Sequence, residues 1–397
     1  MRLKSVRTIR ALKNRRVLLR TDFNVPLENG TVAAEGDERI LRTLPTIRYL
    51  LRRGALVIIA THLGRPDGRV VPRYRLKPLA AYLGRKLKTP VRALPKAVGP
   101  QVAAAVGRAS AGTVLMLENL RFDPGEEENS VPFARALAEL CDLYVNDAFG
   151  NAHREHASMV GVPRYRKSYA GLLLAEEVRV LSGLLARPRR PMAAIIGGVK
   201  LSTKLAVIQT FLKLADDLLL GGNLANTVLK ARGVAVGRSP VEEKLLPSLQ
   251  RLKLTTARLH LPVDVITASG TASGLSTRTL AVANVRSDEY ILDVGPDTVR
   301  LFDAVLRDAR TIVWNGPMGK FELSAFAAGT IGLVHAIAHT RARVVIGGGE
   351  TVAAVRRYLP KPAAAYPNIY LSTGGGAMLE FLERGTLPAL RPLILGT

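Results

Sequence analysis

Four stretches of the sequence place consecutive glycines directly after a short apolar run. The glycines lie at 197–198, 221–222, 347–349 and 374–376, and a helical pattern follows each of them. Bare backbone lets a ligand contact main-chain N–H groups, and the first turn of a helix has unpaired N–H groups with partial positive charge. Such a turn suits a phosphate group. A single turn could equally be an ordinary tight turn, but four of them indicate a ligand with several phosphates.

Polar side chains with a different chemistry follow the apolar runs in the first half of the chain. Asp22 and Asn24 come after one run, and His62 and Arg65 come after the next. A carboxylate and an amide suit a hydroxyl or carboxyl group, and an arginine fork matches phosphate with two parallel hydrogen bonds. Asp and Asn are also common in turns, and a single His is often structural, so those alternatives stay open. The basic residues near predicted strand ends are Arg39, His62, Arg65, Arg121 and Arg154.

Two other clusters in the first half, one of histidines and one of acidic residues, give weaker evidence for a functional site. His153 and His156 are three residues apart, but no neighbouring Cys or third His completes a metal site. We therefore predict no metal there, and we regard Arg154, between the two histidines, as an anion-binding group. The acidic run Glu126–Glu128 is predicted to lie on a solvated face.

Both sets of residues must be positioned by short apolar strands that alternate with helical patterns. This alternation predicts parallel sheets, in which the carboxyl ends of the strands meet at one edge, where ligands of α/β folds bind. A chain of 397 residues is too long for one ordinary core. We therefore predict an α/β fold with two doubly wound parallel-sheet, Rossmann-like domains joined by a hinge helix.

The predicted domain boundaries follow a proline-rich segment in the middle of the chain. An N-terminal domain at 1–169 would hold a small, highly anionic molecule through its side chains. A hinge helix and linker at 170–190 lead into the sequence RPRRP at 187–191. A C-terminal domain at 191–386 would hold a nucleotide through its backbone.

The charge of the chain invites comparison with nucleic-acid-binding proteins. The net charge is +25 and the pI is about 10.7, values that such proteins often have. The arginines are spread along the whole chain, however, and aromatic residues make up only 5%, too few for base stacking. We therefore predict no nucleic-acid partner, and we expect the positive field to steer anionic substrates towards the site.

The sequence has no segment that predicts a membrane or an export route. No apolar run approaches the roughly 18 residues of a membrane span, and the charged N-terminus lacks the apolar core of a secretory signal. One cysteine, Cys141, cannot form an internal disulfide and suits a reducing compartment. We expect a cytoplasmic protein that does not bind a membrane.

The second half contains one more strand that ends in polar residues. This strand leads to Asn315 and Gly316, and Glu322 follows a few residues later. The Glu322 carboxylate could bind a ribose hydroxyl, or it could be an ordinary surface charge. No G-x-x-x-x-G-K-[ST] sequence occurs, which excludes a P-loop NTPase.

Seven motifs in this order make the chain resemble phosphoglycerate kinase. They are RTDFNVP, THLGRP, NDAFGNAHREHAS, GGVKLSTK, WNGPMGKFE, GGGET and STGGGA, and together they extend over nearly the whole chain. The resemblance implies two α/β lobes, with 3-phosphoglycerate or 1,3-bisphosphoglycerate on the first and Mg-ADP or Mg-ATP on the second. It implies a monomer that reversibly transfers the acyl phosphate of 1,3-bisphosphoglycerate to Mg-ADP, directly and in line, after hinge closure. It also implies that the tail 387–397 packs back on the first domain.

The resemblance assigns roles to residues of this chain through its motifs. The substrate-binding residues would be Asp22, Phe23, Asn24, Arg39, His62, Leu63, Gly64, Arg65, Arg121 and Arg154. The nucleotide-binding residues would be Lys200, Lys204, Gly222, Gly295, Asn315, Pro317, Glu322, Gly348, Gly349, Glu350 and Thr351, with Glu350 as the Mg²⁺ ligand. The catalytic residues would be Arg39, Lys200, Gly374 and Gly375, around the travelling phosphoryl group. No nucleophilic side chain is needed, because phosphoryl transfer depends on alignment and on stabilisation of spread negative charge.

Four positions depart from the family pattern. Glu350 stands where the family usually has Asp, the expected Mg²⁺ ligand. The extra methylene of Glu moves the carboxylate by about one bond length, and Mg²⁺ tolerates a distorted coordination geometry poorly. Thr203 replaces an Asp beside the phosphate lysines, Tyr370 replaces a frequent His, and Asn223 stands where a third glycine is common. These departures bear on efficiency more than on identity.

Two other functions therefore stay open. The first is a non-catalytic basic protein of this fold that binds nucleotides or nucleic acid, and the second is a kinase for a different small carboxylate. Activity with 1,3-bisphosphoglycerate and ADP would distinguish the predicted enzyme from both.

Overall fold

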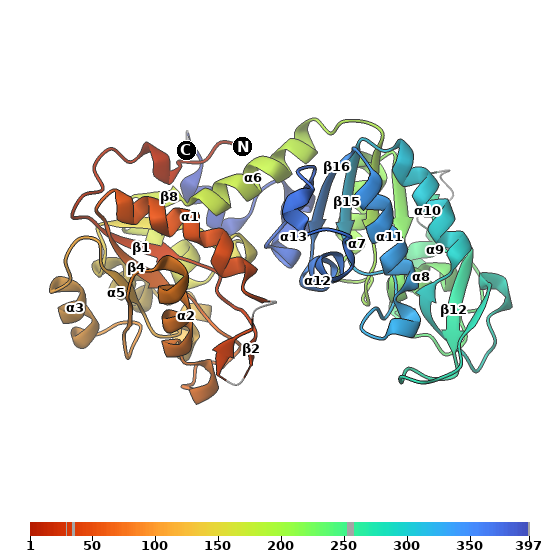
Figure 1. Ribbon diagram of the computed structural model, residues 1–397, viewed down its shortest axis with the longest axis horizontal. Helices are drawn as coiled ribbons and strands as arrows, with labels where there is room; N and C mark the ends of the chain where they lie inside the picture. Colours follow the sequence, from red (N-terminus) through yellow and green to blue (C-terminus); the bar gives the residue numbers. More distant parts are fainter. Residues whose placement is uncertain (29, 34–35, 252–257, 396–397) are drawn as a thin grey trace. The chain divides into compact units, whose positions relative to one another are not determined.

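The computed structural model describes residues 1–28, 30–33, 36–251 and 258–395 of the chain. Its residues form two compact units, and each unit contains a six-stranded sheet covered by helices (Figure 1). The first unit comprises Met1–Ser182 together with Arg384–Thr397, and the second comprises Gly183–Glu383. Within the described ranges, no helix combines the length and the apolar character needed to cross a membrane.

The sheet of the first unit is parallel throughout, with the order β5-β6-β4-β1-β7-β8. On one side of β1 the chain forms β4, then the edge strand β5, and then β6 between them; it continues on the other side of β1 with β7 and β8, which makes the sheet doubly wound. Its strands are β1 Arg16–Arg20, β4 Leu56–Ala60, β5 Val91–Ala93, β6 Val114–Met116, β7 Leu143–Asn146 and β8 Ser168–Ala170. A short hairpin, β2 Leu27–Glu28 with β3 Thr31–Val32, follows β1.

The helices of the first unit cover both faces of this sheet. They are α1 Glu38–Arg52, α2 Lys77–Leu87, α3 Pro100–Gly107, α4 Pro124–Glu127, α5 Val131–Glu139 and the first part of α6 Leu172–Ala186, whose last residues belong to the second unit. Leu19 of β1 belongs to the core formed with α1 and α2, and its neighbour Leu18 belongs to the core formed with α3 and α5. Adjacent residues of a strand point to opposite faces, so an unbroken apolar run is the pattern of a strand buried on both sides.

The second unit repeats this plan, with the parallel order β11-β10-β9-β15-β16-β17. The strands are β9 Met192–Ile196, β10 Asp217–Leu220, β11 Leu259–His260, β15 Thr311–Asn315, β16 Arg343–Gly347 and β17 Ile369–Leu371. The helices are α7 Leu205–Leu214, α8 Gly222–Ala231, α9 Leu246–Arg251, α10 Pro296–Asp308, α11 Ala328–His339, α12 Gly349–Tyr358 and α13 Gly375–Arg384. Trp314 of β15 is fully buried in a core formed with α10, α11 and α12.

A small antiparallel sheet in the second unit has the order β13-β12-β14. Its strands are β12 Asp264–Ala268, β13 Arg278–Ala281 and β14 Tyr290–Val294. This sheet was not predicted from the sequence. The prediction of two doubly wound parallel-sheet domains in an α/β fold is confirmed by the two large sheets.

The last residues of the chain belong to the first unit. The 3₁₀ helix Pro388–Leu393 brings Ala389 to Ala152, whose carbonyl oxygen accepts the Ala389 N–H at 3.1 Å. The Lys4 N–H donates to the Leu393 carbonyl oxygen at 2.7 Å, and the Leu395 N–H donates to that of Arg2 at 3.0 Å. Both ends of the chain are thereby held together within this unit.

Candidate functional site

Polar residues that follow β1 and β4 meet at the carboxyl edge of the first sheet. The Arg39 guanidinium donates to Asp22 Oδ1 at 3.3 Å and to the Asn24 carbonyl oxygen at 3.0 Å. The Asn24 side-chain oxygen accepts the Gly64 N–H at 2.9 Å. Four predicted substrate residues, from two loops and the start of α1, are thus joined by direct hydrogen bonds.

Two buried residues that the sequence analysis missed hold these loops in place. The Thr61 hydroxyl accepts the Phe23 N–H at 3.0 Å and donates to the Thr21 carbonyl oxygen at 2.9 Å. The Asn119 amide donates to the Leu63 carbonyl oxygen at 2.8 Å and accepts the Leu63 N–H at 3.3 Å. The side chains of Phe23 and Leu63 are buried in the core, so their main chains are the parts that a ligand could contact.

His62 lies at the centre of a group of arginines. Its side chain is buried, and burial holds its pKa well below the usual 6.5, with the positive charges of Arg20, Arg121, Arg39 and Arg154 acting in the same direction. At neutral pH the imidazole is therefore uncharged. This collection of positive charge around a neutral hydrogen-bonding ring suits an anion such as a phosphate.

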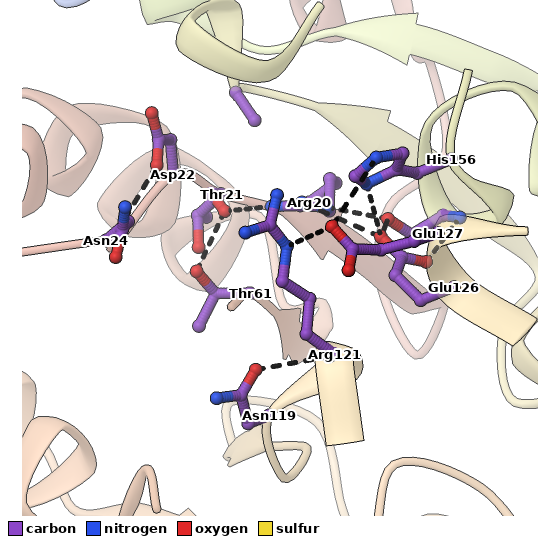
Figure 2. A network of polar contacts seen from close by, with 12 residues as sticks. Arg20, Thr21, Asp22, Asn24, Thr61, Asn119, Arg121, Glu126, Glu127 and His156 are labelled. Atoms are coloured by element: carbon purple, nitrogen blue, oxygen red, sulfur yellow. Dashed lines mark hydrogen bonds and ion pairs between the residues drawn. The ribbon is translucent and has the colours of Figure 1, made fainter. Parts of the chain in front are cut away.

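Arg20, one of these arginines, forms a buried charge pair with Glu126 (Figure 2). Arg20 and Glu126 are both almost completely inaccessible to solvent, with a nitrogen-to-oxygen distance of 3.8 Å. Ser158 joins them, because its hydroxyl accepts from Arg20 Nε at 2.8 Å and donates to Glu126 at 2.6 Å. The Ser158 N–H also donates to the Glu126 carboxylate, at 2.9 Å.

The predicted solvated face at Glu126–Glu128 is therefore wrong for Glu126. Glu127 and Glu128 are exposed, but Glu126 is fully buried on α4. The local run of acidic residues could not reveal this, since the burial depends on Arg20, a distant residue whose own buried charge needs a counter-charge.

Glu127 contacts Arg121, one of the residues predicted to bind the substrate. Its carboxylate oxygen lies 3.3 Å from Arg121 Nε, and the opposite side of the guanidinium donates through NH1 to the Gly64 carbonyl oxygen at 3.0 Å. Figure 2 shows His156 beside the same carboxylates, with ring nitrogens 3.8 Å from Glu126 and 4.0 Å from Glu127. Burial, with the nearby arginines, lowers the pKa of His156 to about 3.

The histidine pair that the sequence analysis considered for metal binding lies in this arginine group. His153 is half-buried, and its pKa is lowered by burial and by Arg154. Arg65, by contrast, is exposed and Arg154 is half-buried. Among the described residues, no group of three or more His, Cys, Asp or Glu side chains could hold a metal ion.

The glycine turns of the second unit lie side by side at the carboxyl edge of its sheet. A Cβ on Gly222 would lie 2.6 Å from the Gly198 nitrogen, and one on Gly375 would lie 3.1 Å from Gly348 Cα. A Cβ on Gly316 would lie 2.1 Å from the Gly197 carbonyl oxygen. Because β10, β9, β15, β16 and β17 are parallel neighbours, their turns form one continuous strip of backbone without side chains.

Side chains predicted to bind the nucleotide hold this strip together. The Asn315 amide donates to the Gly347 carbonyl oxygen at 2.9 Å, and the Gly316 N–H donates to the Thr351 hydroxyl at 2.7 Å. Lys204 donates to the Gly197 carbonyl oxygen at 2.5 Å, and burial lowers the Lys204 pKa to about 8, an effect that Glu350 opposes.

A cavity of about 510 Å³ opens beside the glycine strip. Of the predicted nucleotide residues, its wall contains Gly222, Pro317, Glu322 and Glu350. The others lie outside the described lining of the cavity and are Lys200, Lys204, Gly295, Asn315, Gly348, Gly349 and Thr351. Apolar side chains that could accept a nucleotide base complete the wall, among them Val265, Tyr290, Leu292, Met318 and Leu323.

The predicted residues outside this wall have different positions. Lys200 is exposed on the segment after Gly198, and Gly295 caps the start of α10 beside the Asp264 carboxylate. Gly375 begins α13, and the carbonyl oxygen of the preceding Gly374 accepts the Met378 N–H at 2.8 Å.

Asp293, at the end of β14, is a cavity residue that the sequence analysis missed. Its carboxylate is buried and accepts the N–H groups of Gly329 at 2.8 Å and Val294 at 2.9 Å. Burial raises the pKa of Asp293 to about 7, against these two hydrogen bonds. An acidic residue at the end of an apolar strand, in the sequence ILDVG, was the one signal that could have indicated it.

Comparisons with known proteins agree on one family. The sequence model described as phosphoglycerate kinase matches residues 6–385. The chain is 47% identical to the phosphoglycerate kinase of Pelotomaculum thermopropionicum over 98% of this chain and 99% of that protein. It is 49% identical to the one from Rubrobacter xylanophilus, over 98% of both chains.

Solved structures give the same result. The structure of phosphoglycerate kinase from Coxiella burnetii matches with a TM-score of 0.83 and 39% identity, over 98% of both chains. The crystal structure of phosphoglycerate kinase from Pyrococcus horikoshii matches with a TM-score of 0.85 and 31% identity, again over 98% of both chains.

Proposed function

Because the chain belongs to the phosphoglycerate kinase family, we propose that its first unit binds 3-phosphoglycerate or 1,3-bisphosphoglycerate and its second unit binds ADP or ATP. The chain is an enzyme, a kinase that reversibly transfers the acyl phosphate of 1,3-bisphosphoglycerate to ADP. The assignment of the two substrates to the two units rests on the arginine group around the neutral His62 in one unit and on the glycine strip in the other.

In the first unit, the substrate's two ends would meet different side chains. The phosphate would lie against His62, Arg65, Arg121 and Arg154, since guanidinium groups bind phosphate by parallel, charge-assisted hydrogen bonds. The hydroxyl and carboxyl end would lie at Asp22 and Asn24, with Arg39 near the reacting carboxyl oxygen. The hydrogen bonds from Arg39 to Asp22 and Asn24 support this assignment, because they fix the guanidinium before the substrate arrives.

In the second unit, the nucleotide would place its base among the apolar side chains of the cavity and its phosphates along the glycine strip. Lys200 and Lys204 would neutralise phosphate oxygens, and Glu322 would accept a hydrogen bond from the ribose. The helix α12 starts at Gly349, so its first N–H groups would point towards the terminal phosphate.

We assign Mg²⁺ to the Glu350 carboxylate. Glu350 lies in the first turn of α12 and on the wall of the cavity, and magnesium in nucleotide sites commonly takes one or two protein carboxylates with phosphates and waters. When bound, the ion would neutralise charge on the phosphates. Burial lowers the pKa of Lys204 and the negative charge of Glu350 opposes this effect, so the two side chains interact electrostatically. This proximity to a lysine assigned to the phosphates fits a metal ligand at Glu350.

The residues of the chain would act in transfer by positioning and by electrostatics. A phosphate oxygen of ADP attacks the acyl phosphorus, and the glycerate carboxylate leaves, so no side chain forms a bond. Arg39, Lys200 and the N–H groups at Gly374 and Gly375 would stabilise the charge on the transferring group. This role requires closure about α6 and exclusion of water, which small-angle scattering with both substrates would detect as compaction.

Steady-state kinetics with 1,3-bisphosphoglycerate and ADP, coupled to a reporter of ATP, test the proposal. Arg39→Ala and Lys200→Ala should each lower kcat/KM by at least about 100-fold, which corresponds to about 2.7 kcal/mol of transition-state stabilisation. Arg52→Ala on the same α1 helix and Lys213→Ala on α7, both exposed, should change it less than about twofold. Full activity of both site variants would refute the site, and turnover confined to another acid would indicate a different carboxylate substrate.

The remaining assignments are a monomer, a cytoplasmic location and no nucleic-acid partner. Light scattering of the purified enzyme would test the first, and fractionation of cells would test the second. A shift of DNA at moderate salt by a protein without kinase activity would instead support the basic binding protein.

A further inference from the structure

A second large cavity lies in the second unit, between α10 and α11 and beside the starts of β15 and β16. Its volume is about 940 Å³, and we refer to it as the basic groove. It is lined by the segments that precede β15 and β16, so it lies at the amino edge of the sheet, whereas the glycine strip lies at the carboxyl edge. The proposed reaction makes no use of this groove.

The groove has an unusual concentration of arginine. Five of its fifteen lining residues are arginines, whereas lysine and arginine together account for 57 of the 397 residues in the chain. Of the lining residues that the structure describes, two are acidic, Asp303 and Asp308, which leaves an excess of three positive charges among them. His335 and His339 of α11 add further hydrogen-bonding groups.

Three of these arginines form no ion pair with any residue that the structure describes. Arg307 pairs with Asp303 at 2.5 Å, and Arg300 pairs with Asp297. In the part of the chain that the structure describes, no ion pair is formed by the exposed side chains of Arg189, Arg310 and Arg341. Arg307 lies in the last turn of α10, where its charge complements the negative end of that helix.

The three unpaired arginines come from three separate segments, and hydrogen bonds anchor the backbone of each. The Thr311 hydroxyl donates to the Arg189 carbonyl oxygen at 2.7 Å, and the Arg310 N–H donates to that of Pro191 at 2.8 Å. The Asn368 amide donates to the carbonyl oxygens on both sides of Arg341, at 3.0 and 2.9 Å. The guanidinium groups are therefore presented from ordered backbone, which lowers the entropy cost of binding a ligand.

We propose that the basic groove binds an oligophosphate anion, a linear chain of three or more phosphate groups. Several guanidinium forks suit several phosphates, and the volume of the groove exceeds what a single phosphate fills. Among the lining residues that the structure describes there is no Phe, Tyr or Trp, so the groove lacks a platform for a nucleic-acid base. This chemistry favours the phosphate chain itself over nucleic acid. The RPRRP sequence, which supplies Arg189, acquires a role through this site.

The test is calorimetric titration of the full chain with inorganic tripolyphosphate, in the presence of saturating ADP and 3-phosphoglycerate. The test variant carries Arg189→Gln, Arg310→Gln and Arg341→Gln. The control variant loses the same charge at three exposed sites of the same unit, Lys213→Gln, Arg286→Gln and Lys361→Gln. We expect the test variant to bind tripolyphosphate at least about tenfold more weakly than the control, with an affinity in the wild type that falls as salt is added.

Each outcome decides the proposal. Equal affinities of the test and control variants for tripolyphosphate would overturn the proposal. Any loss of affinity relative to the wild type would then come from the lower net charge or from the substrate sites. Titrations with ATP and with single-stranded DNA test whether a nucleotide or a nucleic acid supplies the phosphates instead. DNA that binds more tightly than tripolyphosphate through the same arginines would also overturn the proposal. If the triple variant fails to fold, Arg341→Gln alone decides in the same way, with Lys361→Gln as its control.

Discussion

Replacing Glu126 by Gln removes the counter-charge of a fully buried arginine and should destabilise the first unit. Arg20 and Glu126 are each about 1% exposed or less, and Ser158 joins them through two short hydrogen bonds. The amide keeps the size of the side chain, and its one oxygen can still accept the Ser158 N–H, so the change removes the charge and the acceptor of the Ser158 hydroxyl. Removal of one partner of a buried pair costs about 3–5 kcal/mol, and we expect about 3 kcal/mol for this conservative replacement.

Urea unfolding followed by two signals can assign this loss to one unit. Trp314 is the only tryptophan of the chain and is buried in the second unit, so its fluorescence reports on that unit, whereas far-ultraviolet circular dichroism reports on both. With a dependence on urea of about 1–3 kcal/mol/M, Glu126→Gln should lower the midpoint of a circular dichroism transition by about 1–3 M. The Trp314 transition should change less.

The neighbouring Glu128 provides a matched control. Its side chain is exposed, so Glu128→Gln should change the unfolding free energy by no more than about 0.5 kcal/mol. Replacing both partners together, by Arg20→Met with Glu126→Leu, should restore much of the stability lost in the single variant, because it leaves no unpaired charge. If Glu126→Gln and Glu128→Gln unfold at the same urea concentration, the reasoning about the buried pair is wrong.

Three further predictions concern the two sites. Because Glu127 holds one side of Arg121, Glu127→Gln should raise KM for 3-phosphoglycerate about threefold to tenfold while KM for ATP stays within about twofold; equal changes in both constants would contradict this role. The pKa of Asp293 is about 7 when folded and about 4 when unfolded, so the folded state binds more protons between these values and stability falls as pH rises from about 4 to 7. The urea midpoints of the Trp314 transition at pH 5, 6 and 7 should therefore vary less in Asp293→Asn than in the wild type. An equal dependence of the midpoint on pH in both proteins would show that another group is responsible. Gly222 and Gly233 both have positive φ, but only a Cβ at Gly222 meets backbone, so Gly222→Ala should lose about 1–3 kcal/mol more unfolding free energy than Gly233→Ala, and equal losses would mean that the turns can separate.

The sequence alone determined the α/β class, the ends of the central strands and most of the residues at the carboxyl edges. These features follow from local patterns, namely an apolar run of about five residues that is followed by a glycine or by a charged residue at the carboxyl end of the strand. Asp22, Asn24, Arg39 and Gly64 could be predicted as neighbours, because parallel strands bring their carboxyl ends to one edge. The ordered motifs added the family, which the comparisons confirm.

Only the tertiary structure decided which polar residues support the site from behind. Arg20 meets Ser158 across 138 residues of sequence, and Asn119 meets Leu63 across 56, so no local pattern relates the partners. The same reason explains why Glu126 was placed on the surface and why Asp293 was missed. From its sequence neighbours alone, a carboxylate in an acidic run is predicted to be exposed. Its burial depends on a distant buried cation, or on backbone N–H groups, that pack against it only in the folded protein. The free energy of the interaction between carboxylate and partner depends in turn on that burial, which only the assembled core provides.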